Sequence, residues 1–379
     1  MKFTINRPAF INQLNNVLRA ISSKTTIPIL TGLKMVVTDH SVILTGSDAD
    51  ITIESTLDVS DSSYGLSIEE PGAIVLPARF FNEVIKKLPD KQATIEVFNG
   101  LQVRITSGTA EFTINGQDAN NYPHLPEVES ENTVELASDM LREVIDQTRI
   151  AVSKQESRPI LTGIHVTLNN GILTAVATDS HRLAQRKVEL PETADRDFDI
   201  VLPGASMTEL AKMIVDEKDG VKMQITENQA LFIFGNTHFY SRLLEGNYPE
   251  TSRLIPESSD TRLEITASDL LASIERASLL SHESRNNVVK LSVNPENKIA
   301  TVSGTSADVG NVEEEINADQ IVGNPLEISF NPDYMRDALK SFGQTKILIS
   351  FTTALRPFTL VPTEEKANFV QLITPVRTY

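Results

Sequence analysis

The 379-residue chain is predicted to adopt an α+β fold of three similar domains, each with two helices packed on outer antiparallel sheets. Two observations support this prediction. Short motifs recur at nearly constant spacing, and the same order of helix-like and strand-like segments accompanies them. Each repeating unit spans about 125 residues, an ordinary domain size. We therefore expect domains at residues 1–127, 128–256 and 257–379.

The first repeated motif comes early in each unit. "PILTGLKM" begins at Pro28, and "PILTGIHV" begins 131 residues later at Pro159. The same spacing takes Asp48 of "LTGSDADI" to Asp179 of "AVATDSHR". A third copy, "VSGTSADV" at 302–309, lies 258 residues beyond "LTGSDADI". These matches indicate one structural unit used three times.

The second repeated motif predicts a helix. It occurs as "IVLPARFFNEVIKKL" (74–88), "IVLPGASMTELAKMI" (200–214) and "ISFNPDYMRDALKSF" (328–342). Its apolar residues recur at i, i+3 and i+7, the pattern of one buried helix face. "NYPHLP" (121–126) and "NYPETS" (247–252) end the first two units. The acidic segments that follow, "VESENTVEL" and "ESSDTRLEI", are predicted to be linkers.

Two helices are expected in each unit. The six predicted helical segments are 8–24, 78–91, 138–158, 206–218, 267–285 and 332–346. Segments with alternating polarity, such as "LQVRITSGTAEFTING", predict the strands between them. Few helices among many strands favour a layer of helices on one face of the sheets.

Composition and charge narrow the class of protein. The chain has no cysteine, which excludes disulfides, thiolate metal sites and cysteine nucleophiles. No apolar run resembles a secretory signal or approaches the length of a membrane span, so we expect a cytoplasmic protein without membrane contact. The net charge is −17, yet the predicted helices carry slightly more cations than anions. A helical surface could therefore face a polyanion while the acidic surface lies elsewhere.

The stretch "ATDSHRLA" (177–184) places Asp179, Ser180 and His181 side by side, which raises the hypothesis of a hydrolase. The repeats argue against it, because Asp50 and Asp308 occupy the position of His181 in the other copies. No nucleophile elbow, phosphate-binding loop, dinucleotide motif or zinc-protease helix is present. We therefore expect a binding loop, with no catalytic residue, metal or cofactor. A third hypothesis, a surface-binding repeat protein, lacks the signal segment that it would need.

Several motifs together resemble one family. "MKFTI", "PILTG" twice, "ATDSHRLA", "EGNYPETSRLIP", "RPF" and "QLITPVRTY" are similar to motifs of the bacterial DNA polymerase III beta subunits, the replicative sliding clamps. The resemblance implies the DNA-clamp fold and a head-to-tail dimer that closes a ring around duplex DNA, with helices lining the hole. It implies a non-enzymatic processivity factor. The implied partners are a second copy, double-stranded DNA of any sequence, the polymerase III alpha subunit, the clamp-loader complex, and other polymerases and repair proteins that bind through short peptide motifs.

The resemblance also implies three sets of site residues. The DNA contacts would be Lys24, Arg79, Gln155 and Arg158. The client-peptide cleft would comprise Leu161, Thr178, Ser180, His181, Arg182, Leu183, Pro249, Arg253, Leu254, Leu355, Pro357, Leu372, Ile373, Thr374, Pro375, Val376 and Arg377. The dimer interface would pair Phe112 and Ile114 with Leu279 and Leu280 of the other copy. Thr109 and Glu111 stand where some relatives carry arginine, so this interface is expected to be mainly apolar.

Overall fold

The computed structural model describes residues 1–124, 128, 132–190, 197–215, 217–283, 287–364 and 368–377. The chain forms two compact units. The first contains Met1–Leu141 and Glu209–Leu243, and the second contains Arg142–Thr208 and Leu244–Tyr379. The boundary between them passes through two helices, so a unit is not the same as a sequence repeat.

A common order of elements occurs three times along the chain, which confirms the predicted repeats. The first copy contains β1 (Lys2–Asn6), α1 (Arg7–Val17), β2 (Gly32–Val37), β3 (Ser41–Ser47), β4 (Ile51–Asp58), β5 (Ser67–Glu70), β6 (Gly72–Pro77), α2 (Ala78–Lys87), β7 (Gln92–Phe98), β8 (Gln102–Ser107) and β9 (Ala110–Asn115). The second contains β10 (Asn132–Leu136), α3 (Ser138–Thr148), β11 (Gly163–Asn169), β12 (Ile172–Thr178), β13 (Arg182–Glu189), β14 (Phe198–Pro203), α4 (Gly204–Met213), β15 (Val221–Ile225), β16 (Gln229–Phe234) and β17 (Thr237–Arg242). The third contains β18 (Thr261–Thr266), α5 (Ala267–His282), β19 (Val289–Asn294), β20 (Ile299–Ser306), β21 (Gly310–Ile316), β22 (Gln320–Gly323), β23 (Leu326–Phe330), α6 (Pro332–Phe342), β24 (Lys346–Phe351), β25 (Phe358–Pro362) and β26 (Phe369–Ile373). Only the strand at the position of β5 and β22 has no counterpart among the described residues of the second copy.

All six predicted helices are present, but each ends earlier than expected. The helix predicted over 8–24 ends at Val17 and continues as a 3₁₀ turn, Leu18–Ala20. The helix predicted over 138–158 ends in the same way, at the 3₁₀ turn Arg149–Ala151. The segments predicted to be linkers also differ, because β10 and β18 occupy their second halves. These strands carry alternating apolar residues, but the acidic residues beside them led to the prediction of linkers. Part of the first segment lies outside the described residues.

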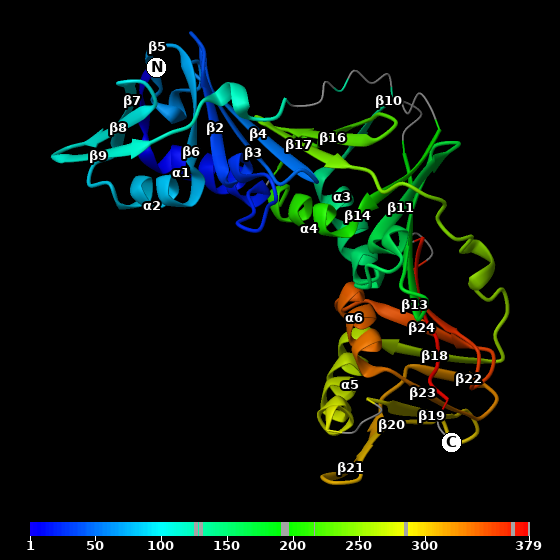
Figure 1. Ribbon diagram of the computed structural model, residues 1–379. Coiled ribbons are helices and arrows are strands. Elements are labelled where there is room, and N and C mark those ends of the chain that lie inside the picture. The colour runs from blue at the N-terminus through cyan, green and yellow to red at the C-terminus, as the bar shows by residue number, and fades with distance from the viewer. Residues whose placement is uncertain are drawn as a thin grey trace. The chain divides into compact units, whose positions relative to one another are not determined.

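Two sheets belong to the first unit. One has the order β5-β1-β7-β8-β9, and the other has the order β10-β15-β16-β17-β4-β3-β2-β6. The second sheet joins strands of two repeats through the antiparallel pair β4 and β17. Helices α1 and α2 lie side by side beneath the strands of the first repeat (Figure 1).

The second unit repeats this construction. Its nine-stranded sheet has the order β14-β11-β12-β13-β26-β25-β24-β18-β22, and its smaller sheet has the order β21-β20-β19-β23. Here the antiparallel pair β13 and β26 joins strands of two repeats. Helices α5 and α6 lie side by side along one side of the strands (Figure 1). The pairs β4–β17 and β13–β26 are therefore equivalent positions of the fold.

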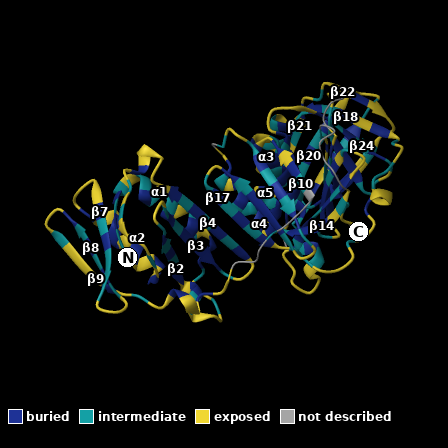
Figure 2. Ribbon diagram, turned by 90° about the horizontal axis from the view of Figure 1, so that it is seen from above, coloured by how far each residue is buried: buried dark blue, intermediate teal, exposed yellow. Residues whose placement is uncertain are grey.

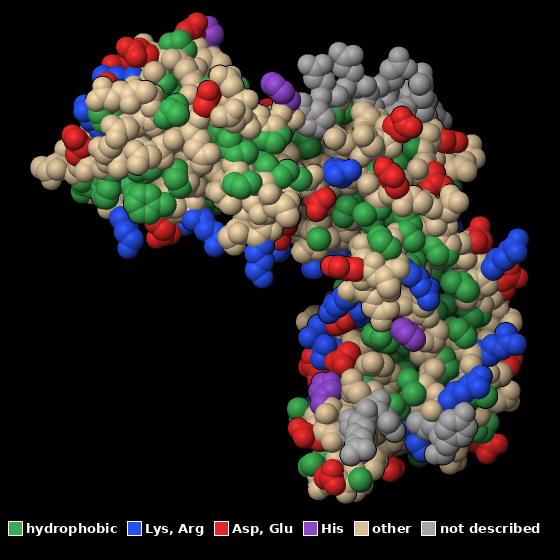
Figure 3. Space-filling model, viewed as in Figure 1, with side chains coloured by type: hydrophobic (Ala, Val, Ile, Leu, Met, Phe, Trp, Pro, Cys, Tyr) green, Lys and Arg blue, Asp and Glu red, His purple; other side chains and the backbone are tan. Residues whose placement is uncertain are grey.

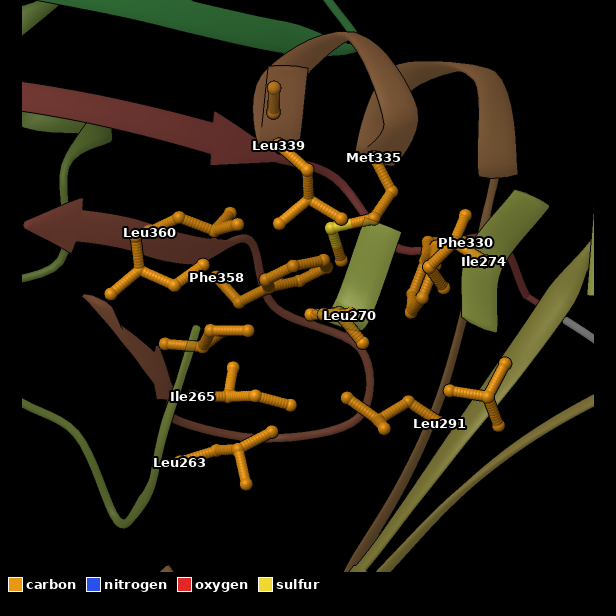
Figure 4. Close-up of a cluster of buried hydrophobic side chains, with 14 of the residues drawn as sticks. Leu263, Ile265, Leu270, Ile274, Leu291, Phe330, Met335, Leu339, Phe358 and Leu360 are labelled. Carbon is orange, nitrogen blue, oxygen red and sulfur yellow. The ribbon is translucent and has the colours of Figure 1, made fainter. Parts of the chain in front are cut away.

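The cores lie where helices meet sheets. In the second unit, strands β18, β19, β23 and β25 contribute Leu263, Ile265, Leu291, Phe330, Phe358 and Leu360, and helices α5 and α6 contribute Leu270, Ile274, Met335 and Leu339 (Figure 4). The predicted apolar stripe of the second helix is buried in each repeat, as at Phe81, Met207 and Met335. Most central strands and the inward helix faces carry buried residues, whereas turns and the edge strand β9 are largely exposed (Figure 2).

Candidate functional site

The turn between β12 and β13 is stabilised by the side chain of Asp179. Asp179 Oδ1 accepts hydrogen bonds from the backbone N–H groups of His181, at 2.9 Å, and Arg182, at 3.0 Å. Ser180, which lies between Asp179 and His181, has a φ of 77°, a left-handed conformation that is costly for residues other than glycine. The carboxylate satisfies amides that the turn would otherwise leave unpaired. Asp179 therefore has a structural role.

The first unit contains the same turn 131 residues earlier. Asp48 Oδ1 accepts hydrogen bonds from the backbone N–H groups of Asp50, at 3.0 Å, and Ile51, at 2.9 Å. Ala49 has a φ of 82°. The turn is thus shared by the first two repeats, and what changes between them is the set of side chains that it presents.

The turn does not have the geometry of a catalytic serine. Arg158 Nη1 donates a hydrogen bond to Ser180 Oγ at 3.2 Å, and no histidine of the described residues does so. The His181 ring instead stacks on Tyr334, with ring centroids 6.3 Å apart and planes 18° apart. An activated serine needs a base within hydrogen-bonding reach. The structure therefore gives the hydrolase hypothesis no support.

Arg182 ties the turn to helix α6. Its side chain is only 9% exposed. Its Nη1 donates to Asp337 Oδ2 at 2.8 Å and its Nε to Asp179 Oδ2 at 3.1 Å, while its Cζ lies 4.5 Å from the centre of the Tyr334 ring. Two of its donors are thus engaged by carboxylates of the protein, so Arg182 positions the turn. Its contact with a client peptide stays a prediction.

A polar cavity adjoins this network. It has a volume of about 480 Å³ and is lined by the turn, by residues 152–155 and by the first part of α6. Gln155 and His181 both contribute to its wall. Tyr334 also lines the cavity, and its hydroxyl pKa is raised by burial and by the nearby Asp179 carboxylate. The Tyr334 hydroxyl consequently remains a neutral hydrogen-bonding group over a wide pH range.

An apolar floor lies beside the turn, where β12, β13 and β26 run next to one another. Val176, Leu183 and Leu372 form a buried cluster, and Ile255 packs against it. Leu183 is paired with Thr178 on one side and with Leu372 on the other. The structure thus brings together two residues of the predicted cleft, Leu183 and Leu372. Sequence reasoning missed Val176, although alternation along β12 places it on the same face as Thr178.

Three further segments carry the other predicted cleft residues. Leu254 is 50% exposed, Leu355 is 62% exposed and Val376 is 36% exposed. Leu161 is buried and lies outside the cluster of Val176, Leu183 and Leu372. The remaining predicted positions lie on the same three segments: Pro249 and Arg253 are exposed before Leu254, Pro357 is half-buried after Leu355, and Ile373, Thr374, Pro375 and Arg377 flank Val376.

Two contacts hold the turn to its surroundings. The backbone N–H of Thr178 donates to the Tyr248 hydroxyl at 3.0 Å. The backbone N–H and the hydroxyl of Thr374 both donate to the His181 carbonyl, at 2.9 Å and 2.8 Å. Burial raises the pKa of Tyr248 to about 12, so this hydroxyl stays neutral and keeps accepting from Thr178. Tyr248 was also missed, although the repeated "NYP" motif marks it.

The predicted DNA contacts are exposed. Lys24 and Gln155 occupy equivalent turns, since their backbone N–H groups donate to Ser22 Oγ and Ser153 Oγ, each at 3.1 Å. Arg79 is exposed near the start of α2, and Lys and Arg side chains project from that side of the first unit (Figure 3). Arg158 differs from these three, because its hydrogen bond to Ser180 links it to the turn.

The predicted dimer residues lie next to sheet edges. Phe112, on the edge strand β9, is 38% exposed, and Leu279, on α5, is 70% exposed. Leu280 is half-buried and Ile114 is buried within its own unit. On the edge strand β21, Glu314 accepts hydrogen bonds from Arg276 Nε and from the Ser273 hydroxyl, both at 2.8 Å. One of the acidic residues on this edge is thus already paired within its own chain.

The described residues contain no group of three or more His, Asp or Glu side chains suited to hold a metal ion. Within the same residues, no helix is both long and apolar enough to cross a membrane.

Comparison with known proteins gives full-length matches. The chain matches the DNA polymerase III beta subunit family in three parts: the N-terminal domain over residues 1–126, the central domain over 135–250 and the C-terminal domain over 252–377. It is 49% identical to the beta sliding clamp of Bacillus subtilis (strain 168), with both chains covered completely. A crystal structure of the DNA polymerase sliding clamp from Bacillus subtilis superposes with a TM-score of 0.96 over 100% of both chains. A structure of the DNA polymerase III beta chain from Streptococcus pneumoniae TIGR4 gives a TM-score of 0.96 at 43% identity, again over 100% of both chains.

Proposed function

Because the chain belongs to the DNA polymerase III beta-subunit family and is a beta sliding clamp, we propose that two copies close into a ring around double-stranded DNA and hold client proteins there. It is a processivity factor and not an enzyme. The proposed clients are the polymerase III alpha subunit, the clamp-loader complex, and other polymerases and repair proteins, all in the cytoplasm. The hydrolase alternative is set aside.

The apolar floor beside the turn is the observation that supports client binding. Leu183 is 1% exposed and Leu372 is 4% exposed, and both lie in a buried cluster beside the turn, where Ser180 and His181 are exposed. Such a surface suits a short peptide that inserts leucine or phenylalanine and hydrogen-bonds with its backbone and a glutamine. Leu254, Leu355 and Val376 are exposed apolar residues available to cover the inserted side chains. We therefore place the client-peptide cleft here.

DNA binding is proposed to be electrostatic and independent of sequence. Lys24, Arg79 and Gln155 are exposed and can contact phosphates, which carry no base information. The net charge of −17 disfavours tight binding to a polyanion, so closure of the ring, and not affinity, would retain the protein on DNA. The exposed Leu279 and Phe112 support apolar contacts between the two copies.

Titration with a peptide tests the cleft. A labelled peptide containing glutamine followed by leucine and phenylalanine is added to the wild-type chain and to Leu183→Ala. We expect the variant to lose about 2 kcal/mol of binding free energy, a roughly 30-fold rise in Kd, because buried anchors dominate such interfaces. Leu168→Ala is the matched control, since Leu168 is equally buried in the same sheet but outside the cluster. Equal affinity of all three proteins would place the cleft elsewhere.

A further inference from the structure

The first unit contains a corner built like the client turn. Strand β4 pairs with β17 there, as β13 pairs with β26 in the second unit, and the two registers match. The corresponding pairs are Ile51↔Ser241 and Thr52↔Tyr240 in the first unit, and Arg182↔Ile373 and Leu183↔Leu372 in the second. Both corners also have the acid-capped turn with a left-handed residue that is described above.

Two further contacts repeat between the corners. The backbone N–H of Arg242 donates to the Asp50 carbonyl at 3.0 Å, as that of Thr374 donates to His181 at 2.9 Å. The tyrosines of the two "NYP" motifs also occupy equivalent positions. Lys34 Nζ lies 5.7 Å from the ring centre of Tyr122, and His165, its counterpart at the 131-residue spacing, stacks on Tyr248 with ring centroids 4.8 Å apart. We call the turn, the carbonyl contact and the tyrosine together the docking frame.

The two docking frames differ in the sheet face beside them. Register places five side chains on this face in each unit. In the second unit they are Val176, Leu183, Gln185, Val370 and Leu372, and in the first unit the residues at the same positions are Thr45, Thr52, Glu54, His238 and Tyr240. Four apolar residues in one face are thus replaced by hydroxyl, imidazole and phenol groups in the other.

The polar face is occupied by its own interactions. Thr45 Oγ1 donates to Glu54 Oε2 at 3.5 Å, and His238 Nδ1 lies 3.9 Å from Glu54 Oε1. The hydroxyls of Thr52 and Ser47 are 2.8 Å apart. Burial raises the pKa of Glu54, which shows how far this carboxyl is already removed from water. An apolar side chain laid on this face would desolvate these groups and supply no hydrogen bond in return.

We propose that the corner formed by β4 and β17 is a second copy of the docking frame, and that its polar face keeps apolar client peptides from binding there. This inference rests on the proposed client cleft. Burying a leucine on the second unit's face gains roughly 1.5–3 kcal/mol, whereas on the first unit's face the same side chain covers polar groups. The side chains at the five face positions therefore decide whether a docking frame binds a client peptide, which leaves one client site in each chain.

Transplanting the face tests the proposal. The cleft of the second unit is first closed by Leu183→Asp. In that background the first unit receives the five residues of the working face, through Thr45→Val, Thr52→Leu, Glu54→Gln, His238→Val and Tyr240→Leu. A further variant also replaces residues 226–228, which connect β15 to β16, by the segment 352–357 that connects β24 to β25 and carries Leu355. The probe is the labelled glutamine-leucine-phenylalanine peptide.

We expect Leu183→Asp alone to show no saturable binding, and the transplanted chains to recover it with a Kd within about 100-fold of wild type, a gap of roughly 2.7 kcal/mol. Thr45→Ser with Thr52→Ser in the same background is the matched control, because it keeps both hydroxyls; it should remain silent. If neither transplanted chain binds the peptide at concentrations up to about 1 mM, the proposal is overturned. Binding by the serine control would overturn it as well.

Folding is checked by far-UV circular dichroism. If the fivefold variant does not fold, Thr45→Val with Thr52→Leu takes its place, and peptide-induced NMR shifts of the introduced methyl groups are the readout; unshifted methyls overturn the proposal. A wild-type chain that fails to bind the peptide, or a Leu183→Asp chain that binds it normally, would refute the client cleft itself. These outcomes are distinct from failure of the transplant.

Discussion

Replacing Arg182 by methionine tests whether its guanidinium holds the client turn against α6. Asp179 and Asp337, its two carboxylate partners, are 14% and 33% exposed, while Arg182 itself is 9% exposed. Removing one partner of a buried ion pair costs about 3–5 kcal/mol. Since Asp337 reaches water, we expect the lower end of that range, about 3 kcal/mol, including roughly 1 kcal/mol from the contact with Tyr334.

Hydrogen exchange of the His181 amide reports this change, because that amide donates to Asp179 within the turn. A loss of about 3 kcal/mol lowers its protection by roughly 150-fold. Lys290→Met is the control, since Lys290 and Glu327 form an exposed pair 3.5 Å apart in the same unit. It should change stability by less than about 1 kcal/mol. An equally small effect of Arg182→Met would refute the positioning role.

Three further predictions concern the surfaces outside the cleft. Leu279→Asp should give folded monomers in sedimentation, because an unpaired charge cannot be buried cheaply; a stable dimer would contradict the apolar interface. Lys24→Glu with Arg79→Glu should weaken retention on DNA and reduce the log–log salt slope by roughly one unit per lost phosphate contact, and an unchanged slope would exclude these residues as contacts. The Arg276 hydrogen bond lowers the pKa of Glu314, so the pair stabilises the fold above the unfolded pKa and stops doing so as pH falls through the folded pKa. Arg276→Gln should therefore raise the Glu314 midpoint in carboxyl NMR; no movement would contradict the pairing.

The repeats made most of the fold predictable from sequence. They gave the element order, the buried face of each second helix and the equivalence of Asp48 with Asp179. Helix ends were less predictable. The predicted helical segment runs on through the turn at Ser22 and Lys24, although α1 has already ended at Val17. Local pattern describes which face a segment buries but not where its hydrogen bonding stops.

The floor of the candidate cleft was only partly predictable. Val176 and Leu183 are close in sequence, whereas Leu372 reaches them through the pairing of β13 with β26. The roles of Arg182 and Asp337 depend on a contact between residues 155 positions apart. Pattern along one strand cannot indicate such partners, and the family resemblance placed Arg182 near the cleft without revealing its hydrogen bonds to Asp179 and Asp337.

Retention on circular and linear DNA tests the central claim most directly. The protein is loaded by a clamp loader onto a nicked circle and onto the same DNA cut once, and the bound fraction is followed by gel filtration at moderate salt. A closed ring held by topology stays on the circle and slides off the linear ends, so we expect long retention on the first and rapid loss from the second. Equal retention on both DNAs would contradict the ring and would favour ordinary surface binding.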